Sequence, residues 1–169
     1  GQLHSVTPVP GTGVTTTLLA VVAVIVMLDS LVAAGTLAQV MGQLGDVSPD
    51  VEDGTALKTS FLAVQELIAQ DLISAGHDRS DGGLITTLLE MAFSGNCGLD
   101  VNLHGTSTVF ETLFAEELGL VVECRAEKVS QVENTLAAAG VPFVRLGIST
   151  ADKQIRLSYN GEQFLDEQM

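Results

Sequence analysis

A single apolar run places the strongest limit on how this chain can fold. Residues 18–28 are all apolar, and the run stops at Asp29. A helix that crosses a membrane needs about 20 apolar residues, so the run is too short for one. It also lacks the basic start and the cleavage site of a signal peptide. Because the run is rich in β-branched residues, we expect residues 18–28 to form a central strand that is buried on both faces.

Size and charge limit the kinds of partner. The chain has 169 residues, and 46% of them are hydrophobic, which suits one domain with a real core. It carries 21 Asp and Glu residues against 7 Lys and Arg, for a net charge of −14. A nucleic-acid surface or an anionic membrane surface would need clustered cations, so neither partner is expected. A substrate with phosphate groups would need Mg²⁺, backbone amides or a cationic neighbouring domain.

The two ends of the chain differ from its middle. Residues 1–13 are rich in Pro, Gly, Thr and Val, which predicts a linker or a truncated edge. With no initiator Met and no basic leader, we expect a fragment of a longer, cytoplasmic protein. We assign residues 14–160 to one domain, and we expect the polar tail, residues 161–169, to fray. Cys97 and Cys124 lie in apolar, strand-like surroundings, which predicts buried, reduced thiols.

Helical and strand-like patterns alternate along the domain. The longest helix is expected over residues 54–74, with one apolar face formed by Leu57, Phe61, Val64, Ile68 and Leu72. The pattern predicts an α+β fold of two or three α/β layers, in which helices pack on the faces of a mixed β-sheet. The other expected elements are helices over 36–44, 84–93, 108–116 and 127–139, and strands over 97–103, 118–124, 141–148 and 154–159.

The stretch from His77 to Gly83 carries the densest polar chemistry of the chain. It places a histidine, two aspartates, an arginine and a serine before two glycines, and an apolar helical pattern follows. The glycines should leave backbone N–H groups open at the start of that helix, where a phosphate can bind. Asp78 and Asp81 supply oxygen ligands of the type that Mg²⁺ uses beside phosphates. The alternative is a polar turn in which Asp81 caps the helix and the glycines only make the bend.

Three other acidic residues are weaker candidates for chemistry. Glu90 lies on a polar stripe of the helix after Gly83, so we interpret it as a solvated or hydrogen-bonded structural residue. Glu116 and Glu117 are neighbours beside a strand, where adjacent side chains point to opposite faces, so they should not act as a pair. The sequence shows no Ser–His–Asp order of a hydrolase, no zinc-ligand spacing and no Walker-type loop.

Three segments, in this order, resemble a known family: His77–Leu84, Glu90–Gly98 and Leu113–Gly119. They are similar to the C-terminal synthase-domain half of phosphoribosylformylglycinamidine synthase, of the aminoimidazole-ribotide-synthase-like superfamily of ATP-using enzymes. The resemblance extends upstream through residues 35–40 and 43–45. It implies a ligase of purine biosynthesis that converts formylglycinamide ribotide to formylglycinamidine ribotide with ATP and glutamine-derived ammonia.

The resemblance also implies roles for residues of the polar stretch. Asp78 looks like the carboxylate that helps to bind Mg²⁺, and Ser80 looks like the hydroxyl that contacts the nucleotide or its phosphate. His77 is implied as a catalytic residue and Asp81 as a supporting contact to the cofactor, while the Gly82–Gly83 pair allows close approach of the backbone to it. The implied partners are the small-molecule substrate, an N-terminal synthase half and a glutaminase domain, and the fragment alone should be inactive.

Two alternatives stay open. The segment Ser30–Thr36 is shorter than the family's glycine-rich loop, and it lacks the arginine and one glycine of that loop's Arg-Leu-Gly-Gly-Ser stretch. This difference favours a structural or interaction module with an incomplete active site. A selenophosphate or thiamine-phosphate kinase type is a third possibility, but the segments Glu90–Gly98 and Leu113–Gly119 argue for the amidine synthase.

Overall fold

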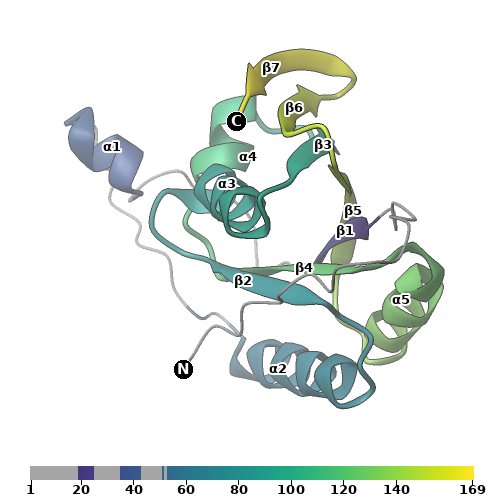
Figure 1. Ribbon diagram of the computed structural model, residues 1–169. Helices are drawn as coiled ribbons and strands as arrows, with labels where there is room; N and C mark the ends of the chain where they lie inside the picture. Colours follow the sequence, from purple (N-terminus) through teal and green to yellow (C-terminus); the bar gives the residue numbers. More distant parts are fainter. Residues whose placement is uncertain (1–18, 25–34, 43–50, 52) are drawn as a thin grey trace.

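The computed structural model describes residues 19–24, 35–42, 51 and 53–169 (Figure 1). The described strands form one seven-stranded sheet in the order β2-β4-β1-β5-β3-β6-β7. Neighbouring strands are antiparallel except for the parallel pair β3 and β6. The strands are β1 (Leu19–Val24), β2 (Ala75–Arg79), β3 (Gly98–Leu103), β4 (Gly119–Arg125), β5 (Phe143–Thr150), β6 (Gln154–Tyr159) and β7 (Glu162–Gln168).

Strand β1 confirms the central place expected for the apolar run. It pairs along its length with β4 on one side and with β5 on the other. Residues 18 and 25–28 of the run lie outside the described residues, as do the side chains of β1 itself. Helices in the described part of the chain are too short or too polar to span a membrane.

Helices cover both faces of the sheet, so the fold is α+β with a mixed sheet, as the sequence predicts. In Figure 1, α2 and α5 lie on one side of the β2–β4 part of the sheet, and α3 and α4 lie on the other. Val121 and Val122 are neighbours in β4 that face these two sides, and each belongs to a different apolar cluster. The helices are α1 (Thr36–Val40), α2 (Gly54–Ala69), α3 (Gly83–Gly95), α4 (Val109–Phe114) and α5 (Val129–Ala138), and a 3₁₀ turn (Ala126–Lys128) precedes α5.

Two helices each bury one apolar face. In α3 the line Leu84, Leu88 and Ala92 is buried, whereas Glu90 on the polar stripe is exposed. Helix α3 ends at Asn96, which caps it with a left-handed backbone at φ 49°. In α5 the buried residues Val129, Val132 and Leu136 lie three and four positions apart, so they share one face.

The predicted inward face of α2 is wrong. Leu57, Phe61 and Ile68 are exposed, and the helix instead buries Ala63 and Leu67. Apolar residues of α2 lie on several sides of the helix, so their spacing does not determine which side packs against the sheet. The stripe that packs carries Ala63 and Leu67, which lie in one apolar cluster with Val132 and Leu136 of α5. The helix also ends at Ala69 rather than near residue 74.

The C-terminal tail is the second correction. Residues 161–169 do not fray, since Glu162–Gln168 form β7 and pair with β6. The pairing brings Leu165 opposite Leu157, which is fully buried. One inward leucine in a polar strand suffices at this end of the sheet, where the other β7 side chains meet solvent.

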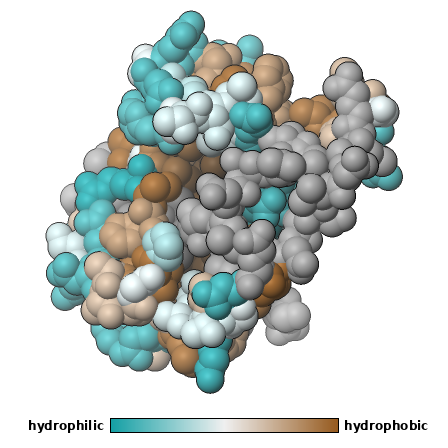
Figure 2. All heavy atoms as spheres, turned by 180° about the vertical axis from the view of Figure 1, so that it is seen from behind, coloured by the Kyte–Doolittle hydropathy of each residue, from teal (hydrophilic) through white to brown (hydrophobic). Residues whose placement is uncertain are grey.

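On the rear of the molecule, apolar and polar patches alternate (Figure 2).

Both cysteines are free thiols, but only one of the two is buried as predicted. Cys124 is buried in β4, and Cys97 is half-buried just before β3. Burial raises the pKa of both thiols, and the negative charge of Glu123 raises it further.

Candidate functional site

The polar stretch His77–Gly83 forms the connection from β2 to α3. Strand β2 ends at Arg79, which pairs with Gly119 at the start of β4, and α3 begins at Gly83. The connection therefore lies beside the loop that joins α4 to β4, residues 115–118. Thr87 of α3 fixes the strand to the helix, because its hydroxyl donates to the carbonyl oxygen of Asp78 at 3.1 Å.

Both glycines of the turn are required by its geometry. Gly82 and Gly83 have φ of 84° and 72°, in the left-handed region that disfavours other residues. A Cβ atom at Gly83 would lie 2.5 Å from the carbonyl oxygen of Leu113, inside the backbone of α4. A Cβ atom at Gly82 would lie 2.2 Å from the hydroxyl of Thr86. Gly83 thus allows the turn to pack against the end of α4, and Gly82 allows it to pack against Thr86.

The residues expected to hold metal and nucleotide are accessible. Asp78 and Ser80 are exposed, and the Asp78 side chain has 74% of its surface free. Arg79 between them is half-buried, and its Nε donates to the carbonyl oxygen of Glu117 at 2.7 Å. Burial lowers the pKa of Arg79, and the charge of Glu117 partly offsets this.

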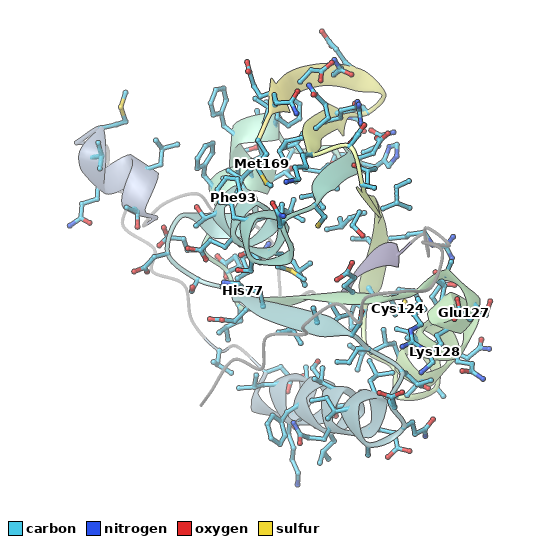
Figure 3. All side chains as sticks on the ribbon, viewed as in Figure 1. His77, Phe93, Cys124, Glu127, Lys128 and Met169 are labelled. Atoms are coloured by element: carbon cyan, nitrogen blue, oxygen red, sulfur yellow. The ribbon has the colours of Figure 1, made fainter. Side chains whose placement is uncertain are left out.

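His77 lies on β2 (Figure 3). Its ring lies between two acidic residues. Its Nε2 lies 2.8 Å from Oε2 of Glu90 on α3. Its Nδ1 lies 2.7 Å from the carbonyl oxygen of Asp78 and 3.4 Å from the Asp78 carboxylate. A neutral ring can donate to one of these sides, and a protonated ring can donate to both. Glu90 is therefore hydrogen-bonded, and sequence reasoning missed its partner because nothing in the spacing of 13 residues between them marks it.

The amides that the sequence predicts to be open are already bonded within the chain. The N–H of Gly82 donates to Oε1 of Glu116 at 2.8 Å, and the N–H of Gly83 donates to the carbonyl oxygen of Ser80 at 2.9 Å. Asp81 makes no helix cap either, since the N-cap of α3 is Gly82 and it has no side-chain cap bond. The amides of Gly82 and Gly83 are therefore not open for an anion, and Asp81 does not cap the helix, which corrects both expectations for these residues.

Glu116 is the residue of this region that the sequence reasoning undervalued. Glu116 lies in the loop before β4. Its Oε1, which accepts from the Gly82 amide, also accepts from the N–H of Thr36 at 2.7 Å. Desolvation would raise the pKa of Glu116, but the amides of Gly82 and Thr36 hold it below its ordinary value. The bonded residues are 34 and 80 positions away in the chain, so spacing gives no signal.

The side chains present fit a metal only in a limited way. Among the described residues, no three His, Cys, Asp or Glu side chains are grouped to hold a metal. Mg²⁺ commonly keeps several waters and takes one or two carboxylates together with substrate phosphates. The exposed carboxylate of Asp78 suits such a shared contact. A self-contained metal centre is not what this part of the chain offers.

The fold and the turn define a class of protein. Residues 20–160 match the family described as AIR synthase related protein, C-terminal domain, and the chain belongs to this family.

Curated relatives make the comparison more particular. The chain is 46% identical over 132 residues to the probable phosphoribosylformylglycinamidine synthase, chloroplastic/mitochondrial, of Arabidopsis thaliana, with 78% of the chain aligned. It is 42% identical over 126 residues, or 70% of the chain, to the phosphoribosylformylglycinamidine synthase of Dictyostelium discoideum. The match spans 9% of each relative's length. The resemblance seen in the sequence is thereby confirmed.

Solved structures show the same fold. PurL of Thermotoga maritima complexed with ATP superposes with a TM-score of 0.69 at 18% identity, over 89% of this chain and 24% of that one. The hydrogenase maturation protein HypE in complex with ATP gives a TM-score of 0.55 at 16% identity, over 89% of this chain and 50% of that one. The mixed sheet with helices on both faces is thus shared with ATP-complexed proteins of different names.

Proposed function

We propose that this chain supplies the metal- and nucleotide-contacting turn of an ATP-dependent amidine-forming ligase of purine biosynthesis. The reaction would convert formylglycinamide ribotide to formylglycinamidine ribotide with glutamine-derived ammonia. The observation that carries the proposal is the exposed pair Asp78 and Ser80, held at the end of β2 in a chain 46% identical to a synthase of that name. ATP would supply the phosphoryl group that turns the amide oxygen into a leaving group.

Each residue of the turn has a proposed task. Asp78 would hold Mg²⁺ together with phosphate oxygens, because its carboxylate is exposed and lies beside no Lys or Arg ion pair among the described residues. The Ser80 hydroxyl would contact the nucleotide, with Asp81 as a supporting contact. The Gly82–Gly83 pair would let the backbone approach the nucleotide closely. This contribution of the protein is mainly positioning and charge neutralisation.

His77 is the proposed catalytic residue. Attack by ammonia leaves a surplus proton on nitrogen, which a base must accept. His77 has carboxylates on both sides of its ring, at 2.8 Å from Glu90 and 3.4 Å from Asp78. The contact of Nε2 with Glu90 keeps the ring in one orientation beside the turn. His77 would therefore be the base of the turn, placed between α3 and the proposed metal-binding side.

The rest of the enzyme is also a proposal. The chain spans 9% of each curated relative, and one structural neighbour is titled PurLQS from Thermotoga maritima. We therefore propose an N-terminal synthase half and a glutaminase domain as partners, and no ATP turnover by this chain alone. The proposed location is the cytoplasm, and an organelle is the alternative because one relative is named chloroplastic/mitochondrial.

The test is Asp78→Asn in the complete enzyme. The substitution removes the charge that would bind Mg²⁺ but keeps the size of the side chain. We expect Mg²⁺-dependent ATP binding to weaken by about tenfold or more, while the free energy of unfolding changes little because Asp78 is exposed. Isothermal titration with Mg²⁺-ATP and a urea titration measure the two quantities. Normal binding and turnover by Asp78→Asn would refute the assignment.

One observation favours the second candidate, a structural or interaction module. The amides at the start of α3 are filled by Glu116 and Ser80 rather than left for a phosphate. If the module reading is right, substitution of Asp78 and Ser80 together leaves the activity of the complete enzyme unchanged, whereas changes in the core reduce assembly.

A further inference from the structure

Three segments that are distant in the sequence meet at Glu116. Its Oε1 accepts from the amide of Gly82 in the turn, and from the amide of Thr36 at the start of α1. Glu116 itself lies in the loop between α4 and β4. The next residue, Glu117, accepts the Arg79 side chain through its carbonyl oxygen. The turn is thus attached at both ends to two consecutive residues of one loop.

We propose that Glu116 is a positioning residue that fixes the Ser80–Gly83 turn and, through it, the placement of Ser80 toward its ligand. This inference rests on the proposed function. It assigns to Glu116 a task that differs from ligand contact, because its carboxylate oxygen is directed at backbone amides of its own chain.

Close backbone packing explains why one carboxylate can hold these segments. A Cβ atom at Gly35 would lie 3.0 Å from the carbonyl oxygen of Phe114 and 3.4 Å from Cδ of Glu116. A Cβ atom at Gly83 would lie 2.8 Å from the Cα atom of Phe114. Both segments therefore touch the last residues of α4 through glycine backbone. The Glu116 side chain bridges the two segments beside Gly35 and Gly83, where a residue larger than glycine would lie too close to the end of α4.

Two other hydrogen bonds hold the turn: the Gly83 amide donates to the carbonyl oxygen of Ser80, and the Thr86 hydroxyl donates to the carbonyl oxygen of Gly82. Both bonds lie within the turn and α3, so the bond to Glu116 is the one that joins the Gly82 amide to the loop before β4. The side chains of Ser80 and Asp81 are exposed. Without the Glu116 bond, the Gly82 amide would turn to water, and Ser80 and Asp81 could sample other conformations. The ligand side chains would then spend less time in the binding geometry, so affinity would fall without any loss of a ligand atom.

The chain offers a matched control. Asp53 caps α2 in the same chemical way, since its Oδ1 accepts from the amides of Thr55 at 2.8 Å and Ala56 at 3.2 Å. Loss of either carboxylate frees two backbone amides at a helix start. Only the loss of Glu116 frees an amide of the turn.

The experiment compares Glu116→Ala, Glu116→Gln and Asp53→Ala in the complete enzyme. Isothermal titration gives the affinity for Mg²⁺-ATP, steady-state kinetics separate KM for ATP from kcat, and hydrogen exchange followed by mass spectrometry reports on peptides that contain Gly82. We expect Glu116→Ala to weaken binding by about tenfold, to raise KM more than it lowers kcat, and to speed exchange at the turn. Glu116→Gln keeps a weaker acceptor and should show a smaller change in the same direction. Asp53→Ala should leave binding and exchange at the turn unchanged.

The outcomes separate the two proposals. Equal effects of Glu116→Ala and Asp53→Ala on binding would overturn the positioning role of Glu116. If Glu116→Ala does not fold, Glu116→Gln decides, and wild-type exchange and affinity in that variant would overturn the role as well. A further outcome is that Asp78→Asn binds Mg²⁺-ATP normally while Glu116→Ala still speeds exchange at the turn. In that case Glu116 holds the turn in a structural role only, and the proposed function is refuted.

Discussion

Replacement of Gly83 by alanine should be among the most damaging single changes in the described part of the chain. Gly83 has a φ of 72°, and a Cβ atom there would lie 2.5 Å from the carbonyl oxygen of Leu113 and 2.8 Å from two atoms of Phe114. The left-handed backbone costs an alanine about 1–2 kcal/mol. The contact with backbone atoms, which cannot rotate away, adds about 1–3 kcal/mol of the kind seen on overpacking.

Gly140 provides the matched control for this prediction. Its φ is 70°, nearly the same as that of Gly83, but a Cβ atom there would meet nothing within 4 Å. Gly140→Ala should therefore lower the free energy of unfolding by only about 1–2 kcal/mol, against about 2–5 kcal/mol for Gly83→Ala. Urea titrations followed by circular dichroism measure both values. Equal losses for the two variants would refute the claim that the turn is pressed against α4.

Two further predictions concern α2 and the pH dependence of stability. Leu67→Ala should lower the free energy of unfolding by about 2–5 kcal/mol because Leu67 is fully buried. Leu62→Ala, on the exposed side of the same helix, should lower it by about 0.5 kcal/mol or less. Urea midpoints that rank the two variants the other way would contradict the observed face of α2. The pKa of Glu116 is lowered in the folded chain from its ordinary 4.5, so the stability it contributes is fully present above about pH 4.5 and is lost as the pH falls through the lower, folded value. The difference in unfolding free energy between the wild type and Glu116→Gln should therefore be constant from pH 7 to pH 5 and should shrink on further acidification, and a difference that does not change down to pH 3 would show that the carboxylate is not the group that holds the two amides.

Local patterns of the sequence were sufficient for much of the fold. The β-branched run predicted β1, and the apolar helical pattern after Gly83 predicted α3, because each signal lies within one element. The inner face of α2 could not be found this way. Leu62, Phe61 and Ile68 are as apolar as Leu67, and only the approach of α5 decides which of them is covered.

The C-terminal strand shows a related limit of sequence reasoning. Residues 162–168 have the polar composition of a loose tail, and only Leu165 is directed to the apolar cluster. Their conformation is set by the backbone of β6, which offers hydrogen bonds to any neighbouring chain. A strand that is stabilised mainly by pairing has no hydrophobic alternation from which it could be predicted.

The candidate site also has one part that the sequence predicts and one part that it does not. Asp78 and Ser80 could be proposed from the sequence because they belong to one short motif, and a motif of polar residues before two glycines has a chemical meaning by itself. What holds them could not be proposed. The amide of Gly82 is bonded to a carboxylate 34 residues later, and the same oxygen binds an amide 80 residues before it, so the bridge exists only once β2 has paired with β4 and α4 has packed on the turn. A sequence motif can therefore name the groups that would meet a ligand, while the residue that keeps them in place is determined by the pairing of distant strands.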